Sequence, residues 1–213
     1  MNNQRHAADK GLTQADFAGN HHLCLIYDDD EQRRKIVTEF MSAGLKQGEL
    51  VRYFTDTTSP QEIRAWLLET GVALPQAEEN GDFAIIKAES AYCPGGCFTP
   101  QEMIDKMVSR YAMAKKAGYR GTRACGEMNW ALRDIPGADR LLEYEVRINT
   151  LTGTFPHMGM CQYDARLFDG ATLFKVLQVH PFMIAQGQIV RNPFYIKPEE
   201  FLAKLSSAHP FLD

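Results

Sequence analysis

The sequence has no glycine between Asn20 and Ala43, the stretch where a nucleotide-binding protein would carry its phosphate loop. Such a loop needs the pattern Gly-x-x-x-x-Gly-Lys-Ser/Thr, because glycine lets backbone N–H groups curl around phosphate and lysine neutralises it. The turn reads Asp28-Asp29-Asp30-Glu31 instead, four acids that would repel a triphosphate and are suited to capping the next helix. The sequence therefore predicts that nucleotide hydrolysis is absent.

Long hydrophobic runs, basic blocks and a signal sequence are also missing. No apolar stretch approaches the roughly 18 residues that span a bilayer, and residues 1–19 are polar. Lys+Arg number 23 and Asp+Glu 27, a net charge of −4, and no basic run exceeds Arg33-Arg34-Lys35. Neither nucleic acid nor membrane is therefore expected as a direct partner. We expect a cytoplasmic protein whose five cysteines are reduced.

Short β-rich runs alternate with longer segments of helical period from Asn20 onward. This alternation is typical of an open, mostly parallel α/β sheet with helices on both faces. Strands are expected at 22–27, 50–55, 83–87, 121–127 and 157–163, and helices at 31–47, 63–70, 100–117, 138–151, 170–178 and from 198. Two β-like pieces around Gly187 predict a small C-terminal hairpin. We expect a flexible tail at 1–19 and a single domain at 20–213.

Several separated motifs carry a family resemblance. The run 38–49 with Tyr53-Phe54-Thr55 and Ser59-Pro60-Gln61-Glu62-Ile63 resembles a KaiC/RecA-type ATPase domain without its phosphate loop. More closely, residues 21–202 resemble the MEDS family, a sensory domain of methanogen and methylotroph (DcmR-like) proteins. The matching pieces are His22-Leu23-Cys24-Leu25-Ile26-Tyr27, Gly118 to Arg123, Gly126 to Ala131, Glu143-Tyr144-Glu145, Cys161-Gln162-Tyr163-Asp164, His180-Pro181 and Asn192-Pro193-Phe194-Tyr195. The resemblance implies a RecA/KaiC-like fold and a sensory role in transcription regulation, with hydrocarbon derivatives among the family's proposed signals.

Candidate binding residues follow from the expected sheet, because ligands of open α/β sheets bind outside the carboxyl ends of the strands. The candidates at or beside these ends are Tyr27, Thr55, Arg123, Glu127, Trp130 and Tyr163, and His180, in a constrained turn before Pro181, is added as a candidate donor to the ligand. A buried Glu127 needs a cationic or ligand donor, so we expect it to pair with Arg123 or with the ligand. Trp130 should share the pocket wall with Glu127, with plain core packing as the alternative. For His180 the alternative is a hydrogen-bonded structural role.

Three cysteines, Cys24, Cys125 and Cys161, fall within expected strands. Buried cysteine behaves as a small hydrophobe, which is one interpretation of all three. The alternative is a soft-metal site, with His21 or His22 close by, if the three strands are neighbours.

Two further cysteines, Cys93 and Cys97, flank a Pro-Gly-Gly bend. They are either a redox pair or two free thiols in a flexible loop. No catalytic triad motif is present, and Gly-x-Ser-x-Gly is absent, so we do not expect an enzyme.

The sequence therefore predicts a non-enzymatic sensor that binds a small, largely apolar molecule at the carboxyl ends of the strands and needs no cofactor. The chain shows no helix-turn-helix or kinase segment. We therefore expect output through a regulatory protein partner or through self-association as a homodimer. The alternatives are a residual nucleotide-binding, ATPase-like domain and a thiol or metal redox sensor.

Overall fold

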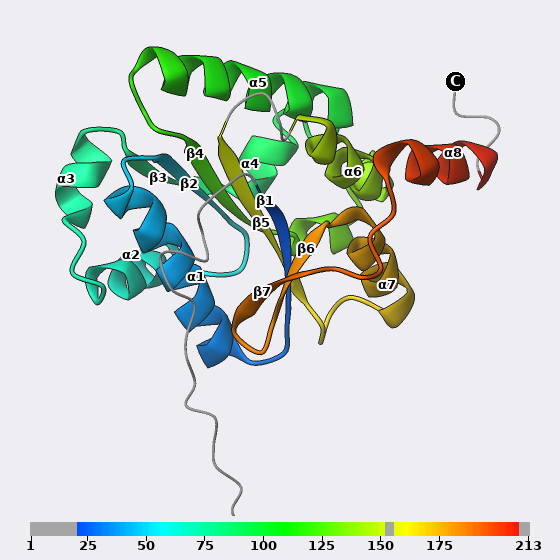
Figure 1. The fold of residues 1–213 in the computed structure, drawn as a ribbon, viewed down its shortest axis with the longest axis horizontal. Helices are drawn as coiled ribbons and strands as arrows, with labels where there is room; N and C mark the ends of the chain where they lie inside the picture. The colour runs from blue at the N-terminus through cyan, green and yellow to red at the C-terminus, as the bar shows by residue number, and fades with distance from the viewer. Residues whose placement is uncertain (1–20, 152–155, 209–213) are drawn as a thin grey trace, which may run out of the picture.

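A seven-stranded sheet forms the centre of the computed structural model, which describes residues 21–151 and 156–208 (Figure 1). The strands are β1 (His21–Tyr27), β2 (Leu50–Thr55), β3 (Phe83–Lys87), β4 (Thr122–Glu127), β5 (His157–Asp164), β6 (Phe182–Ala185) and β7 (Gln188–Arg191). Their order is β3-β2-β4-β5-β1-β6-β7, and every neighbouring pair is parallel except β6 and β7. The predicted open α/β sheet with a C-terminal hairpin is confirmed. The predicted tail at 1–19 lies outside the described residues, and the domain bounds 20–213 stay a prediction.

Helices cover both faces of this sheet (Figure 1). They are α1 (Asp30–Lys46), α2 (Pro60–Leu68), α3 (Leu74–Glu79), α4 (Ala88–Tyr92), α5 (Pro100–Lys116), α6 (Leu141–Leu151), α7 (Gly170–Val179) and α8 (Pro198–Ala208). Side chains of α1, α2 and α3 pack on one face, here the α1 side, and those of α4 to α7 pack on the other, the α5 side. No helix in the described ranges is both long enough and apolar enough to cross a membrane.

Local sequence signals explain where several helices begin. Asp29 accepts a hydrogen bond from the backbone N–H of Gln32 at 2.8 Å, which confirms that the acidic turn caps α1. Ser59 and Glu62 form a reciprocal capping box at the start of α2. The acidic turn therefore stabilises a helix N-terminus, the position at which a phosphate loop would hold its anion.

The structure differs from the predicted elements mainly in short helices. The sequence periodicity did not reveal α3 and α4, because six and five residues are too short to show a helical repeat. The segment predicted as one helix at 138–151 begins as a 3₁₀ turn at Ala138–Arg140 and becomes α6 at Leu141. Gly137 precedes this turn with a left-handed φ of 84°, and a Cβ there would lie 2.2 Å from the Phe98 carbonyl oxygen.

Strand alternation assigns each core residue to one face of the sheet. On β4, Arg123, Cys125 and Glu127 face the α1 side, whereas Ala124 and Gly126 face the α5 side. The α1-side core and the α5-side core are both largely apolar, and the buried polar groups described next lie at their edges or within the α5-side core.

Candidate functional site

The carboxyl end of β4 carries a buried, fully hydrogen-bonded carboxylate. Glu127 Oε1 accepts from Arg33 Nη2 at 2.8 Å and from Tyr53 Oη at 2.7 Å, while Oε2 accepts from the backbone N–H groups of residues 56–58 at 2.6 to 3.1 Å. Burial alone would raise the pKa of Glu127, but the Arg33 charge and these donors bring it below its usual range. The contacts hold the β2–α2 loop against β4, which is a structural role.

The expected pairing of Glu127 with Arg123 is wrong. Arg123 donates from Nε to Glu49 Oε2 at 2.6 Å and from Nη1 to the Phe40 carbonyl oxygen at 2.9 Å. The physical reason is strand geometry: residues four apart on one face of a strand are separated by about 13 Å, beyond the reach of the two side chains in this arrangement. Each charge therefore finds a partner elsewhere on the α1 side: Glu127 binds Arg33 of α1, and Arg123 binds Glu49 in the turn between α1 and β2.

Two other candidates at the strand ends on the α1 side make local contacts. The Tyr27 ring lies beneath the Arg33 guanidinium, with 4.9 Å between the Arg33 Cζ atom and the ring centroid. The Thr55 hydroxyl donates to the Thr58 carbonyl oxygen in the loop that Glu127 also holds. Both residues are buried.

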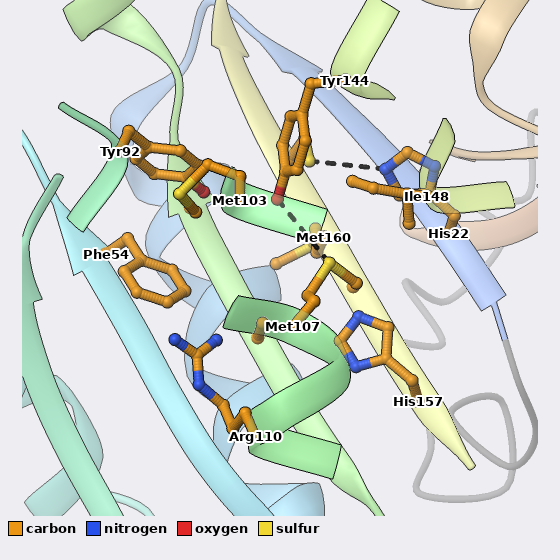
Figure 2. Close-up of a pocket in the computed structure, with 14 residues that line it drawn as sticks. His22, Phe54, Tyr92, Met103, Met107, Arg110, Tyr144, Ile148, His157 and Met160 are labelled. Atoms are coloured by element: carbon orange, nitrogen blue, oxygen red, sulfur yellow. Dashed lines mark hydrogen bonds between the residues drawn. The ribbon is translucent and has the colours of Figure 1, made fainter. Parts of the chain in front are cut away.

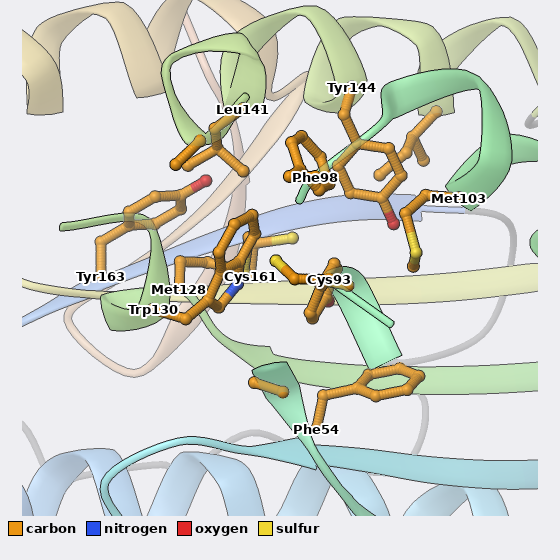
Figure 3. Close-up of a cluster of buried hydrophobic side chains, with 14 of the residues drawn as sticks. Phe54, Cys93, Phe98, Met103, Met128, Trp130, Leu141, Tyr144, Cys161 and Tyr163 are labelled. Atoms are coloured by element: carbon orange, nitrogen blue, oxygen red, sulfur yellow. The ribbon is translucent and has the colours of Figure 1, made fainter. Parts of the chain in front are cut away.

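Trp130 lies on the other side of the sheet from Glu127, so the two do not share a pocket wall. Its ring stacks on Tyr92 with ring centroids 5.0 Å apart. The Trp130 and Phe98 ring centroids are 4.9 Å apart (Figure 3). Strand β4 ends between the two residues, and the chain then enters a 3₁₀ turn at Asn129–Leu132, which places Trp130 in the α5-side core. The predicted crevice with Glu127 and Trp130 as neighbours is therefore wrong.

A small cavity of about 30 Å³ lies instead on the α5-side face of the sheet, beneath α5 and α6 (Figure 2). Its walls are mostly apolar, and none of the seven predicted binding residues lines it. The lining residues are His22, Phe54, Tyr92, Met103, Met107, Arg110, Ala124, Gly126, Tyr144, Ile148, His157, Gly159, Met160 and Cys161. The space exists because the strand residues at its floor, Ala124, Gly126 and Gly159, have little or no side chain.

Four buried side chains with donor atoms meet at the edge of this cavity: His22 from β1, Cys161 from β5, Glu145 from α6 and His180 after α7. Glu145 Oε2 lies 3.0 Å from His22 Nε2, 3.5 Å from His180 Nε2 and 3.4 Å from Cys161 Sγ. Cys161 Sγ lies 3.6 Å from His22 Nε2, the contact dashed beside His22 in Figure 2. We call these four residues the buried cluster.

Burial and mutual contact determine the ionisation of the buried cluster. Burial would raise the pKa of Glu145, but the two histidines lower it well below the usual range. Burial and the neighbouring His180 lower the pKa of His22, against the opposing effect of Glu145. Burial and the Glu145 charge raise the pKa of the Cys161 thiol well above its usual value. The buried cluster therefore holds a carboxylate beside a protonated thiol.

Two of the seven predicted binding residues, Tyr163 and His180, lie at the buried cluster, whereas Tyr27, Thr55 and Glu127 lie together on the α1 side. His180 belongs to the buried cluster, and Tyr163 donates from its hydroxyl to Glu145 Oε1 at 2.8 Å. Sequence reasoning missed Glu145, although its spacing carried a signal: it follows Leu141 by four residues and falls on the buried face of α6. A carboxylate at a core-facing helix position indicates a polar site in the core.

The cysteine predictions have mixed outcomes. Strands β4, β5 and β1 are neighbours, and Cys24 pairs in register with Cys161 on the α5 side. Cys125 faces the α1 side, so the alternative of a metal site shared by all three thiols is wrong. The reason is that Cys161 pairs in register with Gly126, and the neighbouring Cys125 therefore points to the opposite face of the sheet. Cys93 is buried and Cys97 exposed, both as free thiols, and their redox role stays a prediction.

Comparisons with known proteins agree with this architecture. The chain is 29% identical over 181 residues to the transcriptional repressor DcmR of Methylorubrum extorquens (strain DSM 6343 / CIP 106787 / DM4), covering 83% of this chain and 64% of that protein. The chain thus spans just under two thirds of the length of this relative.

Three solved structures share the fold at low sequence identity. An uncharacterized protein of Pyrococcus horikoshii, PH0321, crystallised with an unknown peptide, matches at a TM-score of 0.57 with 16% identity, covering 80% of this chain and 81% of that one. The KaiC-like protein PH0186 of the same organism matches at 0.52 with 13% identity, covering 83% and 91%. The flagellar accessory protein FlaH of Methanocaldococcus jannaschii matches at 0.53 with 11% identity, covering 80% and 76%.

These structural neighbours establish a KaiC-like fold, as predicted from the run after the first strand. The family model described as MEDS, MEthanogen/methylotroph, DcmR Sensory domain, matches residues 21–181, the segment that holds the whole buried cluster. The chain therefore belongs to the MEDS family of sensory domains.

Proposed function

We propose that this chain is the sensory part of a regulatory pathway and that it binds a small, largely apolar molecule in the cavity beneath α5 and α6. The observation that carries the proposal is this cavity, lined mainly by methionine, phenylalanine, tyrosine and isoleucine side chains. An apolar cavity with a few polar groups at its rim is the usual form of a small-molecule site. The MEDS family and the repressor relative support the regulatory part of the proposal.

The cavity volume limits the size of the ligand. At about 30 Å³ it is a fifth of the roughly 150 Å³ cavity that accommodates benzene in an engineered protein. The molecule should therefore have only a few heavy atoms, and Met103 and Met107, with unbranched side chains, can adjust around it. The polar rim supplied by His22, Arg110 and His157 would orient any polar end of the molecule.

The acidic turn after β1 supports a non-enzymatic role rather than the ATPase-like alternative. Asp29 caps α1, and Asp30 is paired with Arg166, which also binds Asp164. A triphosphate at this helix N-terminus would meet carboxylates where it needs backbone N–H groups and a lysine. Titration with a fluorescent ATP analogue and Mg²⁺ tests this point: no binding is expected, and micromolar, Mg²⁺-dependent binding would favour the ATPase-like alternative.

The cavity proposal is tested by NMR on protein labelled with [methyl-¹³C]methionine and titrated with dichloromethane as the probe. The methyl signals of Met103 and Met107 should shift saturably, whereas those of Met41 and Met158, in the α1-side core, should not. Ala124→Val adds bulk at the cavity floor and should abolish the shifts. Ala84→Val makes the same change on β3 outside the cavity and should preserve them. Shifts spread equally over all four methionines, or unaffected by Ala124→Val, would contradict the proposal.

The relay to a regulatory partner, or self-association as a homodimer, is the second part of the proposal. Light scattering coupled to gel filtration, with and without dichloromethane, tests the homodimer. A change in mass with the probe would support relay through self-association, and a monomer under both conditions would leave a separate protein partner as the route.

A further inference from the structure

The buried cluster has the donor set and spacing of a transition-metal site. Two imidazole nitrogens, one thiol sulfur and one carboxylate oxygen come from His22, His180, Cys161 and Glu145, and all four donor atoms lie within 4.8 Å of one another. Zinc binds such ligands at about 2.0 to 2.3 Å in a tetrahedron, which places neighbouring donors roughly 3.3 to 3.7 Å apart. Three of the four distances given above, 3.4, 3.5 and 3.6 Å, fall within this range, and the 3.0 Å between Glu145 Oε2 and His22 Nε2 is shorter than it, so a small side-chain shift would complete the tetrahedron.

Hydrogen bonds outside the buried cluster determine which ring nitrogens face inward. His180 Nδ1 lies 2.8 Å from the Val176 carbonyl oxygen, which can only accept, so Nδ1 carries the proton. The Asn149 amide nitrogen donates to the Val179 carbonyl oxygen at 2.7 Å, so its oxygen faces His22 Nδ1 at 3.0 Å as an acceptor. In its neutral form each ring therefore presents the lone pair of Nε2 to the centre. Such outer partners are typical of metal-binding histidines.

The inward-facing lone pairs create a conflict that a cation resolves. His22 Nε2 and Glu145 Oε2 are both acceptors in this arrangement, yet they lie 3.0 Å apart and are fully buried. His180 Nε2 makes no hydrogen bond of standard geometry with the described residues, although it too is buried and aimed at Glu145. The ion-pair partners recorded for Glu145 in the described structure are these two histidines. Either a proton or a metal ion must lie between the donors.

Charge balance and pairing together favour the metal ion over protons. A divalent ion bound to one carboxylate and one thiolate gives a neutral site and engages both inward-facing Nε2 atoms. One proton shared by His22 and Glu145 also gives a neutral pair, but it leaves the buried His180 Nε2 without a hydrogen-bond donor among the described residues, and a second proton leaves a net positive charge in the core. The rings of His22 and His180 lie only 4.2 Å apart, so charging both would also place like charges side by side. Tyr163 satisfies the second oxygen of Glu145, which leaves Oε2 for the centre.

The main alternative role for these residues is a cysteine nucleophile, because the Cys161 thiol contacts the His22 ring and the His22 ring contacts the Asn149 amide. Nucleophilic thiols need an electropositive, partly exposed setting that favours the thiolate. Cys161 is buried and has the Glu145 carboxylate 3.4 Å away, which opposes thiolate formation. A metal ion reverses this effect, because the metal itself stabilises the thiolate.

We propose that His22, Glu145, Cys161 and His180 bind one Zn²⁺ ion in a closed tetrahedral site at the edge of the cavity. On binding, the Cys161 thiol loses its proton to solvent, and the thiolate, carboxylate and two neutral imidazoles complete the coordination. The site joins β1, β5, α6 and the end of α7, so the ion cross-links the sheet to the α5-side helices. This inference does not depend on small-molecule binding in the cavity.

The full chain is purified without chelator, mixed with Zn²⁺ and separated from unbound ion by gel filtration. Its zinc content is then measured by mass spectrometry. About one tightly bound ion per chain is expected. Cys161→Ser and His180→Gln should lose most of it. Cys125→Ser, a buried cysteine on the opposite sheet face, and His157→Gln, a buried histidine earlier on β5, should keep it. Circular dichroism monitors folding of each variant.

X-ray absorption at the zinc edge of the wild-type protein keeps the proposal testable if the variants fail to fold. One sulfur and three nitrogen or oxygen neighbours are expected in the first shell. A wild-type chain that retains no zinc, a first shell without sulfur, or folded Cys161→Ser and His180→Gln variants with unchanged zinc would overturn the proposal. The NMR titration with dichloromethane is read separately, so failure of the metal site and failure of the cavity proposal are distinguishable.

Discussion

Replacing Glu127 by glutamine should destabilise the protein strongly without affecting the cavity. The two side chains have nearly the same shape, but the amide carries an NH₂ group where Glu127 has an accepting oxygen. On the Oε1 side the amide would face Arg33 and Tyr53, and on the Oε2 side it would face three backbone N–H groups of residues 56–58. In either orientation donors meet donors, and Arg33 loses its buried counter-charge.

The expected loss is about 3 to 5 kcal/mol, the usual cost of breaking a buried ion pair by removing one partner. For a chain of this size each 1 kcal/mol corresponds to about 2 to 4 °C in Tm, so Tm should fall by roughly 6 to 20 °C. Urea unfolding should show a lower midpoint with an unchanged slope. Glu200→Gln, which removes the exposed pair of Glu200 with Lys204, is the matched control and should cost less than about 0.5 kcal/mol.

The stability difference between wild type and Glu127→Gln should depend on pH. The folded pKa of Glu127 lies below its ordinary value of 4.5, so the ionised carboxylate stabilises the fold above that pH and this stabilisation is lost as pH falls. The difference between wild type and Glu127→Gln should therefore shrink below about pH 4.5. A loss of less than about 1 kcal/mol at neutral pH, or altered dichloromethane shifts of Met103 and Met107, would refute the structural role of Glu127.

Three further predictions concern separate parts of the molecule. Burial and the nearby His22 lower the pKa of His157 to about 3, so this neutral ring stabilises the fold above its unfolded pKa of 6.5, and the stability is lost as pH falls toward 3. The gap in urea midpoint between wild type and His157→Gln should narrow over that range, and a constant gap would contradict the assignment. Gly126→Ala places a Cβ 2.7 Å from Tyr92 Oη and should cost about 1 to 3 kcal/mol in thermal or urea unfolding, whereas Gly170→Ala, with open space around it, should be close to neutral. Equal effects of these two changes would argue against the packing of Tyr92 on β4. Cys97 is the exposed cysteine, so one thiol per native chain should react quickly with a thiol reagent and Cys97→Ser should remove that reaction. Rapid reaction of two thiols would show that Cys93 is accessible as well.

Family membership and a KaiC-like fold were predicted from motifs along the chain, and the structure and comparisons confirm them. The acidic turn capped α1 as expected, and Gly187 lies in the turn of the C-terminal hairpin. These features depend on neighbouring residues, because capping, turn formation and strand alternation act over a few positions. The short helices α3 and α4 were missed because too few residues carry their pattern.

The site depended on contacts that sequence spacing does not encode. Glu127 meets Arg33, 94 positions away, rather than Arg123 on its own strand. His22 and Cys161, 139 positions apart, meet because β1 and β5 pair in parallel. By itself the sequence determined the strands, the longer helices and which residues of a strand share one face, because these follow from local periodicity. Only the tertiary structure decided which faces meet, because strand order and helix packing bring together side chains that local periodicity cannot relate.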